Sequence, residues 1–400
     1  MLIRFAFSNF RSFLDRTEVN WLFDGNVPAS VWSTQAATGE RASTVMTVIG
    51  ANASGKTSLL RAILFLNWFA GDSFAGNPAA PLPLEPHVDA LREPSEFEVD
   101  WLLDGRVWRY TLRCTPQRVL REDLYVRHKQ TRRMRYIFQR EWNEAKGAYR
   151  IKQQEFDFAA TEALKTRPNA SLLSTAAQYG VPLAQKLVKN RVWSNVNRMG
   201  RLNIEQQVFK AAGHFFQALS QRERAVELLR SWDLGLSNVE MHEMRVPIPE
   251  GMSEGAPEKL WYPFGKHKLR SGQTVELPFA LESSGTQSAF VLLHHLLPVL
   301  EQGGLAVIDE FESDLHPHML EPILSLFADK HTNPHGAQLL FTCHAVEVLN
   351  ILHKSQVMLV EKDEHNESSA WRLDSVQGIR SDDNFYAKYM AGAYGAVPQL

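Results

Sequence analysis

A glycine-rich segment at residues 50–57, GANASGKT, constrains this chain more than any other feature of its sequence. It fits the pattern G-x-x-x-x-G-K-[ST], follows a short apolar strand pattern at 44–49, and precedes a helical pattern from about 56 to 69. Glycines let such a loop wrap a phosphate, and amide groups at the helix start supply positive potential. We expect Lys56 to reach the β and γ oxygens of a nucleotide and Thr57 to ligate Mg²⁺. The expected phosphate-binding residues are Gly50, Asn52, Ala53, Ser54, Gly55, Lys56, Thr57 and Ser58.

The region after residue 280 narrows the class, because GTPases, kinases and AAA+ motors all have a phosphate loop. An apolar strand pattern at 304–308 ends in two carboxylates, the arrangement called Walker B. We expect Asp309 to hold Mg²⁺ through water and Glu310 to polarise the water that attacks the γ-phosphate. A buried strand that ends in solvated acids is the alternative.

Two further segments complete the expected site. Ser283, Ser284 and Gly285 begin a helical pattern, so their donors can form an anion site for the γ-phosphate of a partner chain's nucleotide. A simple serine helix cap is the alternative. The strand pattern at 338–342 is followed by His344, which we expect near the γ-phosphate, although a single histidine is more often structural.

Strand and helix patterns alternate at both ends of the chain, which predicts an α/β fold with a parallel, doubly wound sheet. Helices are expected at about 285–300, 319–328 and 345–352, and strands at 305–308, 338–342 and 356–360. Short strands around Asp104-Gly105, from 96 to 136, predict an antiparallel β-subdomain. We expect three parts: residues 1–150 with the phosphate loop and β-subdomain, a compact helical insertion at 151–235, and residues 236–400 with the distal motifs.

Five motifs follow one another in the chain: the phosphate loop, the turn at 283–285 (the signature turn), Walker B, the segment 313–317 as D-loop, and His344 as switch histidine. This order resembles that of the ABC-type head domains of RecF/SMC-like ATPases. The segment 9–13, NFRSF, resembles the N-terminal motif of that superfamily, which implies that Arg11 lies near the nucleotide phosphates. The segments 168–174 (PNASLLS), 283–287 (SSGTQ) and 389–398 resemble RloA-like ATPases of bacterial defence loci. The resemblance implies an ABC-type ATPase fold, ATP and Mg²⁺ as cofactors, and a homodimer or higher homo-oligomer. No Q-loop glutamine is evident; Gln178 is a candidate without further support.

Composition limits the compartment and the partners. The chain has 400 residues, 44% of them hydrophobic, a formal net charge of -2, and two cysteines. A disulfide-poor chain without a signal peptide pattern or an apolar run of about 18 residues is expected in the cytoplasm, away from membranes.

A basic stretch from Arg106 to Arg140 holds 11 Lys and Arg residues against two acids, with aromatic residues interleaved. Such a stretch can bind nucleic acid, although strand alternation would also place many of its arginines on an ordinary solvated face. Three functions therefore stay open. The first is an ATPase that dimerises on ATP and controls a separately encoded effector, such as a nuclease or toxin, in anti-phage defence. The others are a DNA-binding clamp of repair or recombination and a slowly hydrolysing scaffold.

Overall fold

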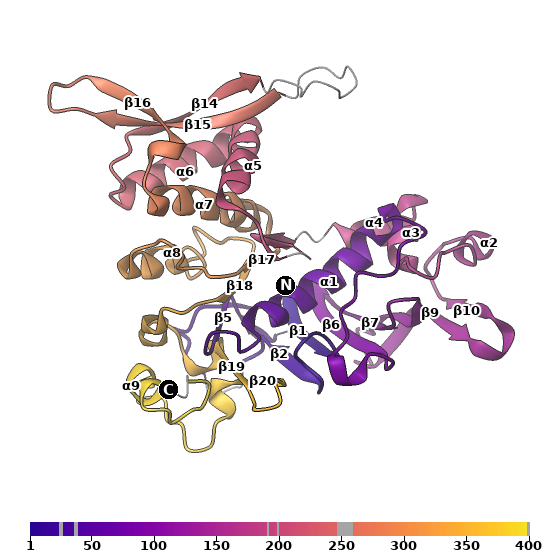
Figure 1. Cartoon of the computed structure of the whole chain (residues 1–400). Helices are drawn as coiled ribbons and strands as arrows, with labels where there is room; N and C mark the ends of the chain where they lie inside the picture. The colour runs from indigo at the N-terminus through magenta and orange to yellow at the C-terminus, as the bar shows by residue number, and fades with distance from the viewer. Residues whose placement is uncertain (24–26, 36–38, 190–191, 198–199, 246–258, 398–400) are drawn as a thin grey trace.

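A six-stranded sheet forms the centre of the protein (Figure 1). The computed structural model describes residues 1–23, 27–35, 39–189, 192–197, 200–245 and 259–397. The sheet has the order β11-β17-β18-β5-β19-β20, in which the first five strands are parallel and β20 is antiparallel to β19. Their bounds are Val192–Ser194 (β11), Leu305–Ile308 (β17), Gln338–Thr342 (β18), Val45–Ile49 (β5), Val357–Lys362 (β19) and Ser368–Arg372 (β20). The expected parallel sheet is therefore present.

Helices cover both faces of this sheet because its central strands are apolar on both sides. In β17, Leu305 and Val307 pack in the same core cluster as α1 (Lys56–Asp72), whereas Ala306 and Ile308 pack in the cluster of α7 (Ser284–Gln302). Such two-sided burial is typical of parallel sheets. The loop between β5 and the start of α1 lies at the carboxyl edge of the sheet, where α/β proteins bind ligands.

A second, antiparallel sheet of seven strands has the order β10-β9-β8-β7-β6-β1-β2. Its strands are Leu2–Ser8 (β1), Thr17–Asn20 (β2), Ser95–Leu103 (β6), Arg106–Cys114 (β7), Val119–Arg127 (β8), Met134–Asn143 (β9) and Ala148–Gln153 (β10). Asp104 and Gly105 form the two-residue turn between β6 and β7, both with positive φ. The expected β-subdomain is thus present and also takes in the two N-terminal strands.

The segment 151–235 is not the single compact helical insertion that we expected. Helices α2 (Ala160–Ala163) and α4 (Pro182–Val188) contact α3 (Leu172–Gln178), which lies against α1, whereas α5 (Ile204–Gln217) and α6 (Leu219–Ser231) pack on α7. Figure 1 shows the two groups on different sides of the molecule. They separate because β11, which lies between them in sequence, pairs with β17 in the central sheet.

The helices α5, α6 and α7 form an upper lobe with a three-stranded antiparallel sheet of β14 (Asn238–Arg245), β15 (Lys259–Lys268) and β16 (Thr274–Pro278) (Figure 1). In the C-terminal part, α8 spans Leu320–Ser325 and α9 spans Phe385–Met390. The helix expected at 345–352 is wrong, because that segment forms a 3₁₀ turn at Val346–Asn350. The short strands β3 (Ser33–Gln35) and β4 (Arg41–Ser43) form a hairpin. No helix among the described residues has the length and apolar character to cross a bilayer.

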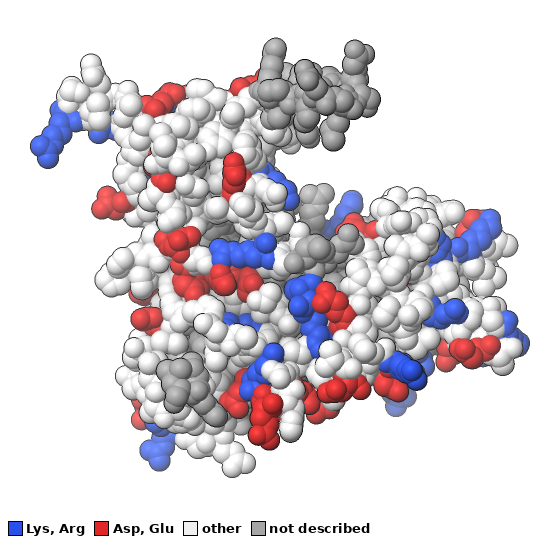
Figure 2. All heavy atoms as spheres, viewed as in Figure 1, with Lys and Arg blue, Asp and Glu red and all other residues white. Residues whose placement is uncertain are grey.

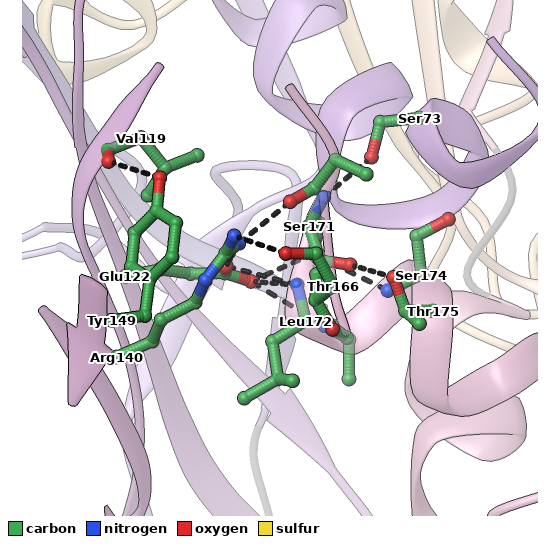
Figure 3. A network of polar contacts seen from close by, with 12 residues as sticks. Ser73, Val119, Glu122, Arg140, Tyr149, Thr166, Ser171, Leu172, Ser174 and Thr175 are labelled. Atoms are coloured by element: carbon green, nitrogen blue, oxygen red, sulfur yellow. Dashed lines mark hydrogen bonds and ion pairs between the residues drawn. The ribbon is translucent and has the colours of Figure 1, made fainter. Parts of the chain in front are cut away.

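A fully buried ion pair joins the antiparallel sheet to α3 (Figure 3). Glu122 in β8 accepts hydrogen bonds from the Ser171 hydroxyl at 2.7 Å, the Leu172 amide at 2.9 Å and the Tyr110 hydroxyl at 2.8 Å. Its partner, Arg140 in β9, pairs with it at 3.2 Å and donates to three main-chain carbonyls, those of Thr166, Arg167 and Ala170. Paired partners are what a buried charge requires.

This arrangement explains the 168–174 segment in structural terms. Ser171 caps α3 by accepting from the amides of Leu173 and Ser174, and the Asn169 side chain donates to carbonyls of Asn77, Pro78 and Ala80. The segment therefore fastens the loop that follows α1 to the antiparallel sheet.

Candidate functional site

A surface pocket of about 770 Å³ lies at the carboxyl edge of the central sheet. That volume suits a small-molecule ligand of nucleotide size. Its lining combines cations and carboxylates with the glycine-rich loop: Arg11, Ser12, Asn52, Ala53, Ser54, Gly55, Lys56, Thr57, Ser58, Glu85, Pro86, His87, Val88, Asp309, Glu310, His344, Lys362 and Asn366. Most of the residues expected from the sequence thus line one cavity.

The glycine-rich loop runs from β5 to the first turn of α1. A Cβ at Gly50 would collide with the carbonyl oxygen of Val360, and one at Gly55, where φ is +115°, would lie 2.5 Å from the Ser368 hydroxyl oxygen. Both positions therefore require glycine. The hydroxyl of Ser54 is buried and has no hydrogen-bond partner among the described residues, which leaves a donor available to a ligand oxygen.

Lys56 lies in the same loop with its ammonium turned inward. Its Nζ donates to the carbonyl oxygens of Gly50 at 2.9 Å and Ala51 at 2.8 Å. Burial lowers the pKa of Lys56 from its ordinary value, and the charges of Asp309, Glu312 and Glu310 oppose that change. A phosphate in the loop would give this ammonium stronger acceptors than carbonyls.

The two residues expected to handle Mg²⁺ are in direct contact. The Thr57 hydroxyl donates to Asp309 Oδ2 at 2.9 Å, and the Thr342 hydroxyl donates to Asp309 Oδ1 at 2.6 Å. Oxygen ligands beside a phosphate site are the donor set that Mg²⁺ prefers, so Thr57 and Asp309 fit that ion. Thr342 also accepts from the Glu310 amide at 2.7 Å, which couples β18 to both carboxylates.

Asn195 is a site residue that the sequence did not reveal. It follows β11 and is buried, and its amide group forms two hydrogen bonds with the main chain of Asp309, at 2.9 and 2.8 Å. Both amide atoms are therefore committed to holding the Walker B strand. Gln178, in contrast, is the exposed last residue of α3 and does not line the pocket.

Glu310 occupies the carboxyl edge in a left-handed conformation, with φ of 49°. Its carboxylate pairs with Arg201 and accepts from the Ser313 hydroxyl at 3.2 Å. His344 is exposed at the pocket, and its amide donates to Glu312 at 2.6 Å. The structure thus brings both expected catalytic side chains to the cavity, and Arg201 and Glu312 are contacts that the sequence did not indicate.

Arg11 also lines the pocket, where its side chain contacts α1 and the loop segment that contains Glu85. Its guanidinium pairs with Glu85 at 2.5 Å and donates to Ser58 at 3.3 Å, and Glu85 pairs with Arg61 at 2.8 Å. Arg11 has a φ of 56°, so its backbone is held in a strained conformation at this position.

The signature turn, residues 283–285, lies outside the lining of this pocket. Ser283 caps α7 by accepting from the Thr286 amide at 3.1 Å, so the helix-cap alternative also describes the structure correctly. A Cβ at Gly285 would lie 2.8 Å from the carbonyl oxygen of Asp314, which places this turn against the 313–317 segment. Among the described residues that line the pocket, none belongs to 283–285.

Comparison with known proteins identifies the family. Residues 45–350 match the family model AAA_21, described as "AAA domain, putative AbiEii toxin, Type IV TA system". The chain belongs to the AAA_21 family. It is therefore an ATPase domain of the AAA/ABC type. No curated protein of similar sequence was found.

Solved structures show which ABC fold this AAA_21 protein has. It is similar to an SMC head bound to the C-winged helix domain of ScpA, with a TM-score of 0.50 and 12% identity over 94% of this chain and 99% of that one. The SMC head domain from Thermotoga maritima matches with a TM-score of 0.39 and 14% identity over 93% of this chain and 98% of that one. A Pyrococcus furiosus SMC head with an extended coiled coil, bound to the C-terminal domain of ScpA, matches with a TM-score of 0.44 and 10% identity over 94% of this chain and 97% of that one. The first of these similarities shows that the fold is that of an SMC-type head.

The basic stretch of this AAA_21 ATPase is not one open cationic surface. Besides Arg140, five arginines are paired with acids: Arg109 with Asp100, Arg113 with Glu96, Arg121 with Asp123, Arg127 with Glu40 and Arg135 with Glu155. Arg140 is fully buried, as are Tyr110 and Phe138 nearby, so none of the three can contact a polynucleotide. The exposed cations Lys129, Arg132 and Arg133 lie between β8 and β9. Figure 2 shows acidic and basic side chains intermixed on the visible face, in agreement with this pairing.

Proposed function

We propose that this protein binds and hydrolyses ATP between two copies of itself and uses the reaction as a conformational switch. One observation supports the two-chain site above all. The phosphate loop, Thr57, Asp309 and Glu310 gather at one pocket, whereas the signature turn of the same chain lies outside its lining. A donor-rich helix start that lies outside the pocket of its own chain can bind the γ-phosphate held by a partner.

The roles follow from the contacts. Gly50, Asn52, Ala53, Ser54, Gly55, Lys56 and Ser58 would cradle the phosphates, and Thr57 and Asp309 would hold Mg²⁺. Arg11 would lie near the phosphates, Glu310 would polarise the attacking water, and His344 would contact the γ-phosphate. Ser283, Ser284 and Gly285 of the partner would complete the site. ATP supplies the differential affinity that favours the closed dimer.

The second part of the proposal concerns the protein that this ATPase controls. We infer a separately encoded effector in an anti-phage system, located in the cytoplasm. The family description supports this, because it names a putative toxin and a type IV TA system. A DNA-binding clamp has weaker support, because the arginines that would hold the backbone are largely paired or buried.

Trapping the ATP-bound state tests the proposal. Glu310→Gln removes the carboxylate that would polarise water and keeps the side-chain shape, so ATP should bind without turnover. Sedimentation velocity should show this variant shifting from monomer to dimer with ATP and Mg²⁺ but not with ADP. The same variant with Lys56→Ala added serves as the control and should not shift. A Glu310→Gln variant that stays monomeric at saturating ATP and Mg²⁺ contradicts the proposal.

A further inference from the structure

The carboxylate assigned to water activation is already bound by another side chain. Arg201 Nη1 pairs with Glu310 Oε2 and also donates to the Ser313 hydroxyl at 2.8 Å, while Ser313 donates to the same Glu310 oxygen at 3.2 Å. That oxygen thus receives two hydrogen bonds from protein groups. An oxygen engaged in this way is poorly placed to accept a proton from an attacking water.

The pair is built to open rather than to hold the fold together. The Arg201 side chain is 33% exposed and that of Glu310 is 46% exposed. Exposed ion pairs contribute little to stability because water screens them and both side chains lose freedom. Closure of the site can therefore break this contact at low cost.

The position of Arg201 links the contact to the signature-bearing lobe. Arg201 belongs to the short hairpin of β12 (Val196–Asn197) and β13 (Gly200–Arg201), which connects β11 of the central sheet to α5 of the upper lobe. At one end of this connector, Asn195 is fixed to Asp309 by two hydrogen bonds. At the other end, Asn203 caps α5, which packs on α7. A movement of the lobe against the sheet must therefore act on Arg201.

Ser313 links the same contact to the expected dimer face. Ser313 begins the 313–317 segment. Gly285 of the signature turn packs against Asp314, the next residue in the chain. The Arg201–Glu310–Ser313 cluster thus joins three elements that a partner chain would approach together.

We propose that Arg201 is a positioning residue that holds Glu310 in an unproductive arrangement and releases it when two protomers close on ATP. This inference rests on the proposed function. It adds that opening the Arg201–Glu310 contact opposes dimer closure, so that a nucleotide-bound monomer keeps Glu310 away from water. Each dimer that closes releases two such contacts.

The dissociation constant of the nucleotide-bound dimer tests this proposal. We would measure it by sedimentation with a non-hydrolysable ATP analogue and Mg²⁺ for the unmodified protein, Arg201→Ala and Arg201→Lys. Arg201→Ala should tighten the dimer about 4- to 25-fold, the square of the roughly two- to fivefold effect that one exposed ion pair allows. Arg201→Lys keeps the charge and should shift less. Arg135→Ala removes an exposed pair outside the pocket lining and should leave the dimer dissociation constant unchanged.

Two readouts separate this role from a merely structural one. In a Glu310→Gln background, which removes the charge from the contact, Arg201→Ala should leave the dimer constant unchanged. Turnover at saturating protein should not fall in Arg201→Ala, because Arg201 has left Glu310 in the closed state. An unchanged or weaker dimer in the analogue experiment overturns the proposal, as does a loss of saturated turnover in a folded variant. Failure of the proposed function is distinguishable, since Glu310→Gln alone would then not dimerise.

Discussion

Two arginine–glutamate pairs in this protein have the same chemistry and opposite settings. Glu122 and Arg140 are completely buried and surrounded by hydroxyl, amide and carbonyl partners (Figure 3). Glu310 and Arg201 lie half-exposed at the pocket, with Ser313 as their shared neighbour. Burial makes the first pair hard to break without damage to the fold, whereas exposure makes the second easy to rearrange. The setting, rather than the residue types, therefore separates a structural pair from a candidate switch.

The largest effect expected from this comparison is on folding stability. Arg140→Ala leaves a buried carboxylate without its countercharge and should lower the free energy of unfolding by about 3–5 kcal/mol. Arg135, which lies in the same strand β9 as Arg140, forms an exposed pair with Glu155, so Arg135→Ala should change the free energy of unfolding far less. Urea unfolding of both variants checks the difference. Equal losses in the two would show that burial does not distinguish these pairs.

A smaller effect concerns buried histidines in the upper lobe. Burial, together with the charges of Lys210 and His214, lowers the pKa of His295 to about 3, and burial lowers that of His294 as well. The unfolded chain therefore binds more protons between about pH 3 and 6.5. The stability contributed by the neutral histidines is complete above about pH 6.5 and is lost as the pH falls; for His295 the loss is about 2 kcal/mol at pH 5.

Replacing one of these histidines checks that sign and size. His295→Gln removes the titrating ring and can still bond with Gln207, the residue that contacts His295 Nε2 at 3.3 Å. Between pH 7.5 and 5, the unmodified protein should lose about 2 kcal/mol more unfolding free energy than the variant. Parallel pH profiles for the two proteins would contradict the assignment of a neutral, buried His295.

The parts of the fold that were predicted correctly depend on local patterns. The strands at 305–308 and 338–342 and the helices after the phosphate loop and the signature turn are continuous apolar runs with clear ends. These runs also fixed where Lys56, Asp309 and His344 lie relative to the sheet. Local sequence carries this information because each motif sits directly at the end of its own strand.

The parts that were missed depend on contacts between distant segments. Asn195 and Arg201 lie in a short irregular stretch, and their importance arises only when β11 pairs with β17, more than a hundred residues later. Strand alternation suggested solvated arginines in β9, but Glu122 on the neighbouring strand draws Arg140 into the interior. Single-sequence patterns do not record such partners.

Mixing two defective proteins tests the central claim most directly. Lys56→Ala disables the phosphate loop, and Ser284→Arg blocks the signature turn with a bulky charge, so each variant alone should lack ATPase activity. In a mixture, a dimer of one chain of each kind joins the intact phosphate loop of one variant to the intact signature turn of the other, so one of its two sites is complete. The account predicts that the mixture recovers part of the ATPase activity of the unmodified protein. A mixture no more active than its separate components would contradict a site shared between two chains.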